Sequence, residues 1–250
     1  MSSNENADLQ GSAGEKQLGG VGKIPFYLVC DESGSMAGAP IDAVNQGLAQ
    51  IFREIAADPI VDDKAMIGVI AFQASAEVLV PLSSTSEVAS IPSCNAGGTT
   101  SYKSAFIKLK EQIQVDVERI RSLGHSVGRP VVFFMSDGAP NRENWQEAHA
   151  ALVERDDSKN PYRPHIISFG VGEAKGEVIR AVASDVDRAK GTRFAYIAAE
   201  GVSPGPALAE IMHFITGTIV GSARKSEVVI PQIPESSGVM LIDPLPIPNV

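Results

Sequence analysis

An apolar run that ends abruptly in oxygen-bearing side chains constrains this chain more than any other feature. Residues 24–30 are almost entirely apolar and are followed by Asp31, with hydroxyls at the alternate positions Ser33 and Ser35. A strand of this composition is typical of a parallel sheet covered by helices on both faces. The three polar side chains offer only oxygen atoms, which Mg²⁺ prefers as ligands. We therefore expect a Mg²⁺ site at the end of this strand.

Strand and helix patterns alternate along the rest of the chain. Further strands are expected at 65–72, 77–80, 131–135, 165–169 and 194–197, and helices at 41–55, 101–120, 145–155, 177–183 and 208–219. The connection before 77–80 is so short that only an antiparallel hairpin can accommodate it. The alternation predicts a doubly wound, Rossmann-like α/β fold: a mostly parallel six-stranded sheet with one antiparallel edge strand and helices on both faces.

The two ends of the chain differ in composition from the middle. Residues 1–22 are polar and Gly/Ser-rich, which predicts a flexible leader, and 23–225 are expected to form one domain. Repeated prolines exclude a long helix from 226–250, which we expect to be an extended tail. Three roles for this tail stay open: a strap on its own domain, a docking segment for a partner, or an autoinhibitor that offers Glu235 or Asp243 to the metal site.

Composition excludes several classes of partner and location. The chain has a net charge of −9 and no run of Lys and Arg, which argues against nucleic acid binding. Cys30 and Cys94 are its only cysteines, and they lack metal-binding spacing, so a reducing, cytoplasmic setting is favoured. The chain shows neither the pattern of a signal peptide nor an apolar run of about 20 residues that could span a membrane.

Two more oxygen donors are predicted to lie beside the first three. Asp137 follows strand 131–135, and the loop Gly97-Gly98-Thr99-Thr100 precedes the helix at 101–120. In open α/β sheets, ligands bind beyond the carboxyl ends of neighbouring strands, where the strand order reverses. We therefore expect a site built from residues that are far apart in the sequence.

At this point the chain resembles the von Willebrand factor type A (VWA) domain, with its metal-ion-dependent adhesion site (MIDAS), over residues 24–224. The motif D-x-S-x-S, then Thr, then Asp is matched by Asp31, Ser33, Ser35, Thr99 and Asp137. The resemblance implies that the hydroxyls bind Mg²⁺ directly, with Mn²⁺ or Ca²⁺ as alternatives, and that the two Asp act largely through water. Thr99 is favoured over Thr100, and Glu32 is expected to point into solvent.

The resemblance also implies a function. A Glu or Asp carboxylate of a partner protein would complete the metal's coordination. Stand-alone bacterial VWA proteins associated with tellurium resistance and stress are the most similar group, and they are linked with protein kinases and phosphatases, so a cytoplasmic scaffold is expected. An accessory subunit of an ATPase or chelatase complex is the alternative. A Mg²⁺-dependent aspartyl phosphatase is disfavoured, because Ser33 stands where such enzymes need a second Asp, so no catalysis is expected.

Overall fold

The computed structural model describes residues 22–156, 158, 160–187 and 192–242, and its main sheet has seven strands in the order β3-β2-β1-β4-β5-β8-β9. Their bounds are β1 Ile24–Asp31, β2 Ala65–Phe72, β3 Ala76–Ser83, β4 Val131–Ser136, β5 His165–Gly170, β8 Ala195–Ala198 and β9 Val239–Leu241. The edge strands β3 and β9 are antiparallel to their neighbours, and the five between them are parallel. The predicted doubly wound α/β class is confirmed.

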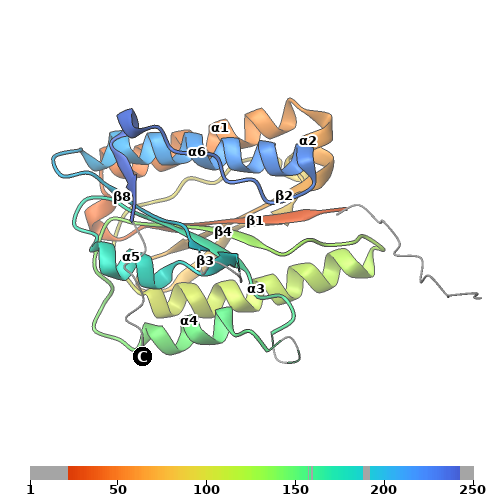
Figure 1. The fold of residues 1–250 in the computed structure, drawn as a ribbon, viewed down its shortest axis with the longest axis horizontal. Helices are drawn as coiled ribbons and strands as arrows, with labels where there is room; N and C mark the ends of the chain where they lie inside the picture. The colour runs from red at the N-terminus through yellow and green to blue at the C-terminus, as the bar shows by residue number, and fades with distance from the viewer. Residues whose placement is uncertain (1–21, 157, 159, 188–191, 243–250) are drawn as a thin grey trace, which may run out of the picture.

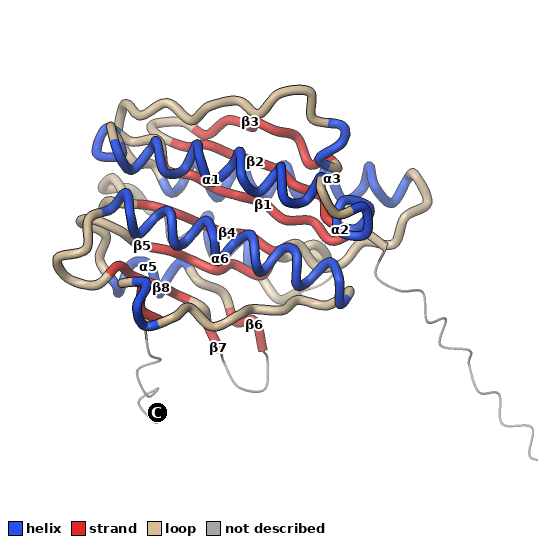
Figure 2. The backbone as a smooth tube through the Cα atoms, turned by 90° about the horizontal axis from the view of Figure 1, so that it is seen from above, coloured by secondary structure: helices blue, strands red, loops and turns tan. Residues whose placement is uncertain are grey.

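Helices cover both faces of this sheet, as Figures 1 and 2 show. One face carries α1 (Ala39–Ala56), α2 (Pro59–Lys64) and α6 (Pro204–Lys225), and the other carries α3 (Tyr102–Ser122), α4 (Trp145–Val153) and α5 (Gly176–Val182). Each layer buries its own apolar cluster against the sheet. In the ranges that the structure describes, no helix combines the length and the apolar character needed to cross a membrane.

The prediction of six strands was one short, because the Pro-rich segment after α6 supplies β9. After α6 the chain packs Val228, Ile230 and Ile233 against the core and then pairs β9 with β8. A second, two-stranded sheet, β6 (Asp185–Asp187) with β7 (Thr192–Arg193), was also not predicted. Residues 1–21 of the predicted leader and 243–250 of the tail, which include Asp243, lie outside the described residues.

Helices α1 and α6 lie side by side over the sheet (Figure 2), and a glycine permits their close approach. A Cβ on Gly47 would lie 2.4 Å from Cγ and 2.5 Å from Cβ of Met212 on α6. We expect Gly47→Ala to lower the free energy of unfolding by about 1–3 kcal/mol through overpacking, although alanine is the better helix former. Chemical denaturation followed by circular dichroism measures this loss.

Gly217 on α6 provides the matched control for this substitution. Among the described residues, the nearest atom outside its own helix to a Cβ on Gly217 would be Pro231 Cγ at 4.0 Å. Gly217→Ala should therefore stabilise the protein by up to about 1 kcal/mol. Met212→Ala introduced into the Gly47→Ala protein should recover part of the loss, because it removes the clashing atoms. Equal effects of the two glycine substitutions would contradict a packing role for Gly47.

Candidate metal site

The candidate site lies at the left-hand end of the sheet in Figure 1, where β1 and β4 end. Asp31 is the last residue of β1, Ser136 is the last residue of β4, and Asp137 follows directly. The two strands are parallel neighbours with Cys30 opposite Met135, so their carboxyl ends lie together. The sheet thus brings together two carboxylates that lie far apart in the sequence.

Hydrogen bonds connect the predicted ligands on these two strand ends. Asp31 Oδ1 accepts from the Ser33 backbone N–H at 2.8 Å. The Ser33 and Ser35 hydroxyl oxygens are 3.1 Å apart, and the Ser35 hydroxyl donates to Asp137 Oδ1 at 2.8 Å. Asp31, Ser33 and Asp137 are buried, whereas Ser35 is exposed. The cluster is therefore continuous, and it reaches solvent at Ser35.

Sequence reasoning missed Ser136 as a part of this cluster. Its hydroxyl donates to Asp31 Oδ2 at 2.5 Å, so both carboxylate oxygens of Asp31 are held in place. The available signal was one hydroxyl residue at the end of the apolar run 131–135, directly before Asp137. Ser136 positions Asp31, because its hydrogen bond restricts rotation of the carboxylate.

In the loop before α3, Thr100 is buried beside this cluster, whereas Thr99 is exposed. The Thr100 hydroxyl and the Ser35 hydroxyl lie 3.9 and 3.7 Å from the position that a Cβ on Gly138 would take, and Thr100 is buried. Thr99 is exposed, and its hydroxyl accepts a hydrogen bond from the Asn141 side-chain amide at 3.2 Å. Thr100 is thus the better-placed hydroxyl of the two.

The expectation that Glu32 points into solvent was wrong. Glu32 is only 4% exposed, and its Oε1 accepts from the Asn95 N–H at 2.7 Å. Its backbone carbonyl accepts a hydrogen bond from the Gly97 N–H. The neighbouring residue must be a glycine, because a Cβ on Gly98 would lie 2.4 Å from Gln73 Oε1. Gly98 also has a φ of +66°, which favours glycine. Glu32 therefore holds the threonine loop against the end of β1.

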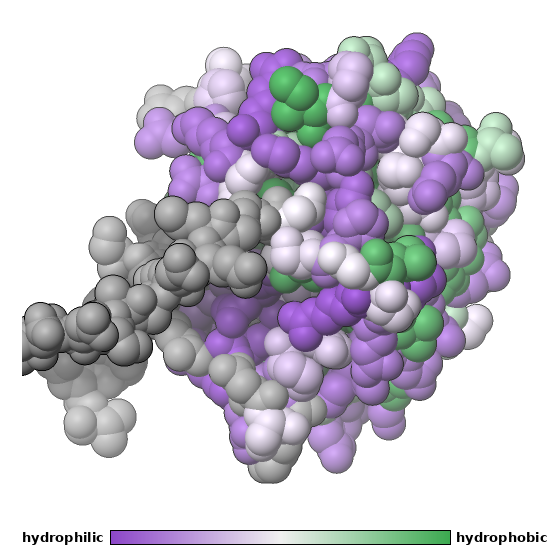
Figure 3. Space-filling model, turned by 90° about the vertical axis from the view of Figure 1, so that its right-hand side faces the viewer, coloured by the Kyte–Doolittle hydropathy of each residue, from purple (hydrophilic) through white to green (hydrophobic). Residues whose placement is uncertain are grey.

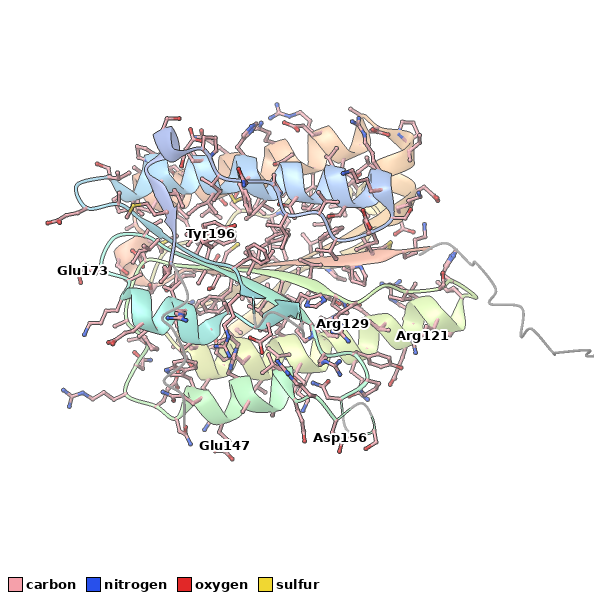
Figure 4. The ribbon with its side chains drawn as sticks, in the orientation of Figure 1. Arg121, Arg129, Glu147, Asp156, Glu173 and Tyr196 are labelled. Atoms are coloured by element: carbon pink, nitrogen blue, oxygen red, sulfur yellow. The ribbon has the colours of Figure 1, made fainter. Side chains whose placement is uncertain are left out.

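Burial of the two aspartates shapes the electrostatics of the site. Burial, with a smaller contribution from the charge of Asp137, raises the pKa of Asp31 to about 6, in spite of hydrogen bonds from Ser136 and Ser33. Burial also raises the pKa of Asp137, and the Glu173 carboxylate acts in the same direction. Figure 4 shows Glu173 at this end of the molecule. Neither aspartate pairs with a Lys or Arg among the described residues, so a cation would relieve the repulsion.

The donor set fits a hard divalent cation. Its side chains offer carboxylate and hydroxyl oxygens only, which is the chemistry that Mg²⁺ selects. In the described part of the chain no group of three or more His, Cys, Asp or Glu side chains is placed to hold a metal. The hydroxyls would therefore have to supply a large share of the protein ligands at this site.

Comparison with known proteins finds a partial family match and a shared fold. The family model described as von Willebrand factor type A domain matches residues 26–139. A von Willebrand factor type A structure from Catenulispora acidiphila is similar over 80% of this chain and 43% of its own, with 13% identity and a TM-score of 0.54. Proximal thread matrix protein 1 from the mussel byssus, whose MIDAS motif holds zinc, is similar over 79% and 48%, with 12% identity and a TM-score of 0.51.

A third similar structure is a mutant of the PilB minor pilin from Streptococcus sanguinis, with 12% identity, a TM-score of 0.53, and coverage of 84% of this chain and 64% of the pilin. The chain thus spans less than two thirds of the length of these structures, and at such identities they share its fold alone. No curated protein matches it. Residues 26–139 thus match the von Willebrand factor type A family model, and the chain shares the fold of these structures.

Proposed function

We propose that this chain is a Mg²⁺-dependent protein-interaction module that binds an acidic residue of a partner protein. The observation that carries the proposal is the convergence of Asp31, Ser33, Ser35 and Asp137 at the ends of two neighbouring strands. Buried carboxylates without a basic partner among the described residues are costly unless a cation neutralises them. When bound, Mg²⁺ supplies a coordination position that a carboxylate of the partner can take.

The proposed ligands divide by burial and charge. Ser33, Ser35 and Thr100 would provide neutral oxygens, and Asp31 and Asp137 would provide the negative charge, largely through water. Ser136 would orient Asp31 through its 2.5 Å hydrogen bond. A partner would approach the exposed side of the cluster, where Ser35 lies. Thr100 replaces the earlier preference for Thr99 in this proposal because of its burial and position.

We also propose that the module has no catalytic activity of its own. An aspartyl phosphatase needs a second carboxylate two residues after its nucleophile, and this chain has Ser33 there. The Ser33 hydroxyl is engaged with Ser35, and no basic residue is paired with Asp31 among the described residues. A cytoplasmic scaffold in signalling or stress, of the kind associated with tellurium resistance, is the role that we propose.

Calorimetric titration of the full chain with Mg²⁺ tests the site. The neighbouring pair Thr100→Val and Thr99→Val forms a matched comparison, because each removes one hydroxyl with little change in volume. We expect Thr100→Val to weaken Mg²⁺ binding by about tenfold or more, and Thr99→Val to leave it almost unchanged. Asp137→Ala should abolish measurable binding, since it removes one of two charges. Unchanged affinity in both Thr100→Val and Asp137→Ala would overturn the proposed site.

Partner capture from a lysate separates adhesion from a structural use of the metal. Partners retained by the wild type in Mg²⁺ should be lost in a chelator and lost again with Thr100→Val. Thr99→Val should retain them. Capture that persists in the chelator would contradict a metal-dependent interaction.

A further inference from the structure

A cavity at the other end of the sheet gathers arginines that are scattered in the sequence. It has a volume of about 270 Å³, and its lining includes Arg129, Arg155, Arg163, Arg193, His149 and Asp185. Figure 4 shows Arg129 far from Glu173, which marks the metal-site end of the molecule. β1 begins at the right-hand side of Figure 1, and Figure 3 shows that side of the molecule, whose visible surface is mostly hydrophilic. This cavity is therefore separate from the candidate metal site.

Sheet topology explains why these arginines meet. Arg129 and Arg163 each lie two residues before a central strand, and those strands, β4 and β5, are parallel neighbours with Val131 opposite His165. Arg155 follows α4, and Arg193 ends β7. The sequence has no basic run, and the basic cluster forms only when the chain folds.

The positive charge of this lining exceeds its negative charge. Among the described residues, Asp185 is the only carboxylate that lines the cavity, against four arginines. One oxygen of Asp185 accepts from Arg155, and the other accepts from Arg193 Nε at 2.8 Å. Arg163 is only 6% exposed, and its Nη1 donates to the carbonyl of Arg155 at 3.4 Å. The described lining residues therefore carry more arginines than carboxylates.

The arginine charges contribute to lowered pKa values of two histidines beside the cavity. His149 Nε2 lies 2.8 Å from the Val182 carbonyl, and its pKa is lowered by burial and, less strongly, by Arg193. Burial and the charges of Arg129 and Arg163 lower the pKa of His165 to about 4. Its Nδ1 is buried and has no hydrogen-bond partner within the described ranges. The surroundings favour negative charge and disfavour further positive charge.

We propose that this cavity binds the phosphate group of a small molecule, as inorganic phosphate or as a phosphomonoester. Guanidinium groups bind phosphate with paired, directional hydrogen bonds. Arginines from separate segments can surround a tetrahedral phosphate, whereas a planar carboxylate ligand would need only one of them. The volume lies just below the usual range for small-molecule sites, about 300–1,000 Å³, which favours a compact ligand. A nucleic acid backbone would need an extended basic surface instead.

Titration calorimetry with the full chain in a chelator tests this site without contribution from the metal site. The probes are inorganic phosphate and phenyl phosphate, and succinate is the carboxylate comparison. Arg129→Gln and Arg193→Gln should each weaken phosphate binding by about tenfold or more, because each removes a charged hydrogen-bond donor. Arg129→Lys should also weaken it, since lysine keeps the charge and loses the planar fork. Arg53→Gln, an exposed change on α1, is the matched control and should bind as the wild type does.

The two phosphate probes distinguish the sources of the ligand. Tighter binding of phenyl phosphate indicates a phosphomonoester, and binding of inorganic phosphate alone indicates the free ion. Amide chemical shifts of the wild type provide a second measurement that needs no folded variant, and they should change at His165 and Asp185 and not at Asp31. No binding of either probe at millimolar concentration, succinate binding as tight as phosphate binding, or shifts elsewhere would overturn the proposal.

Discussion

Replacing Phe134 with alanine is expected to lower the free energy of unfolding by about 3–5 kcal/mol. Phe134 is fully buried on β4, and its ring centroid lies 5.2 Å from that of Phe72, 4.9 Å from that of Tyr102 and 5.4 Å from that of Phe106. The substitution would leave a cavity among rings that belong to β2 and α3. β4 itself leads into the site at Asp137. For a chain of this size the midpoint of thermal unfolding should fall by roughly 10 °C.

The Phe134 result has a surface control and a structural consequence. Val115→Ala on α3 alters a residue that is 60% exposed and should change the free energy of unfolding by no more than about 0.5 kcal/mol. Tyr102 packs edge-to-face on Phe134 and donates from its hydroxyl to the Gly138 carbonyl at 3.2 Å, beside Asp137. A loss of less than about 1 kcal/mol for Phe134→Ala would contradict its central place in this cluster.

The main elements of the fold could be predicted because the buried strands are continuous apolar runs. β1, β2 and β4 are buried at every position, so their sequences lack the alternation of a half-exposed strand. Helix α1 shows its buried stripe at helical spacing, from Ile41 to Ile55. Local pattern and tertiary burial agree in these elements, which is why the α/β class followed from the sequence.

The elements that were missed are short and depend on neighbours. β9 has three residues between an irregular, Pro-rich stretch and the end of the described chain, and two of the three are exposed. It forms because the edge of β8 offers unpaired backbone groups and because Val239 packs into the core. The β6–β7 pair is similarly short. Neither has a periodic pattern that a single sequence could reveal.

The candidate site was predictable in part for a related reason. Asp31 and Asp137 end apolar runs, so topology alone predicts that they meet. Adjacent threonines, by contrast, differ only in the direction of their side chains, and that direction depends on the loop conformation at Gly98 and on contacts such as that of Glu32 with Asn95. The arginine cavity combines separate segments between residues 129 and 193, and no local pattern marks it.

Asp31→Asn is expected to raise the stability of the metal-free protein while it removes the metal function that we propose. Burial raises the pKa of Asp31 from 3.8 to about 6, so the folded state holds this proton more tightly than the unfolded state. Stability from this group is complete below pH 3.8 and is lost as the pH rises through 6. At pH 7 the ionised carboxylate then costs on the order of 2–3 kcal/mol, which asparagine avoids.

Chemical denaturation at pH 7 in a chelator measures this gain, and repetition in excess Mg²⁺ measures its reversal. Asparagine keeps an oxygen for the Ser33 N–H, and its amide can donate to the Ser136 hydroxyl, so the local hydrogen bonds can be maintained. Asp42→Asn, at an exposed position in the first turn of α1, should change stability by less than about 1 kcal/mol in either condition. Mg²⁺ should stabilise the wild type and not Asp31→Asn, because only a state that binds the ion gains from it. If Asp31 destabilises the metal-free protein and the protein becomes more stable only when the metal binds, the buried carboxylate is explained by metal binding. A lower stability of Asp31→Asn in the chelator would assign Asp31 a structural role instead.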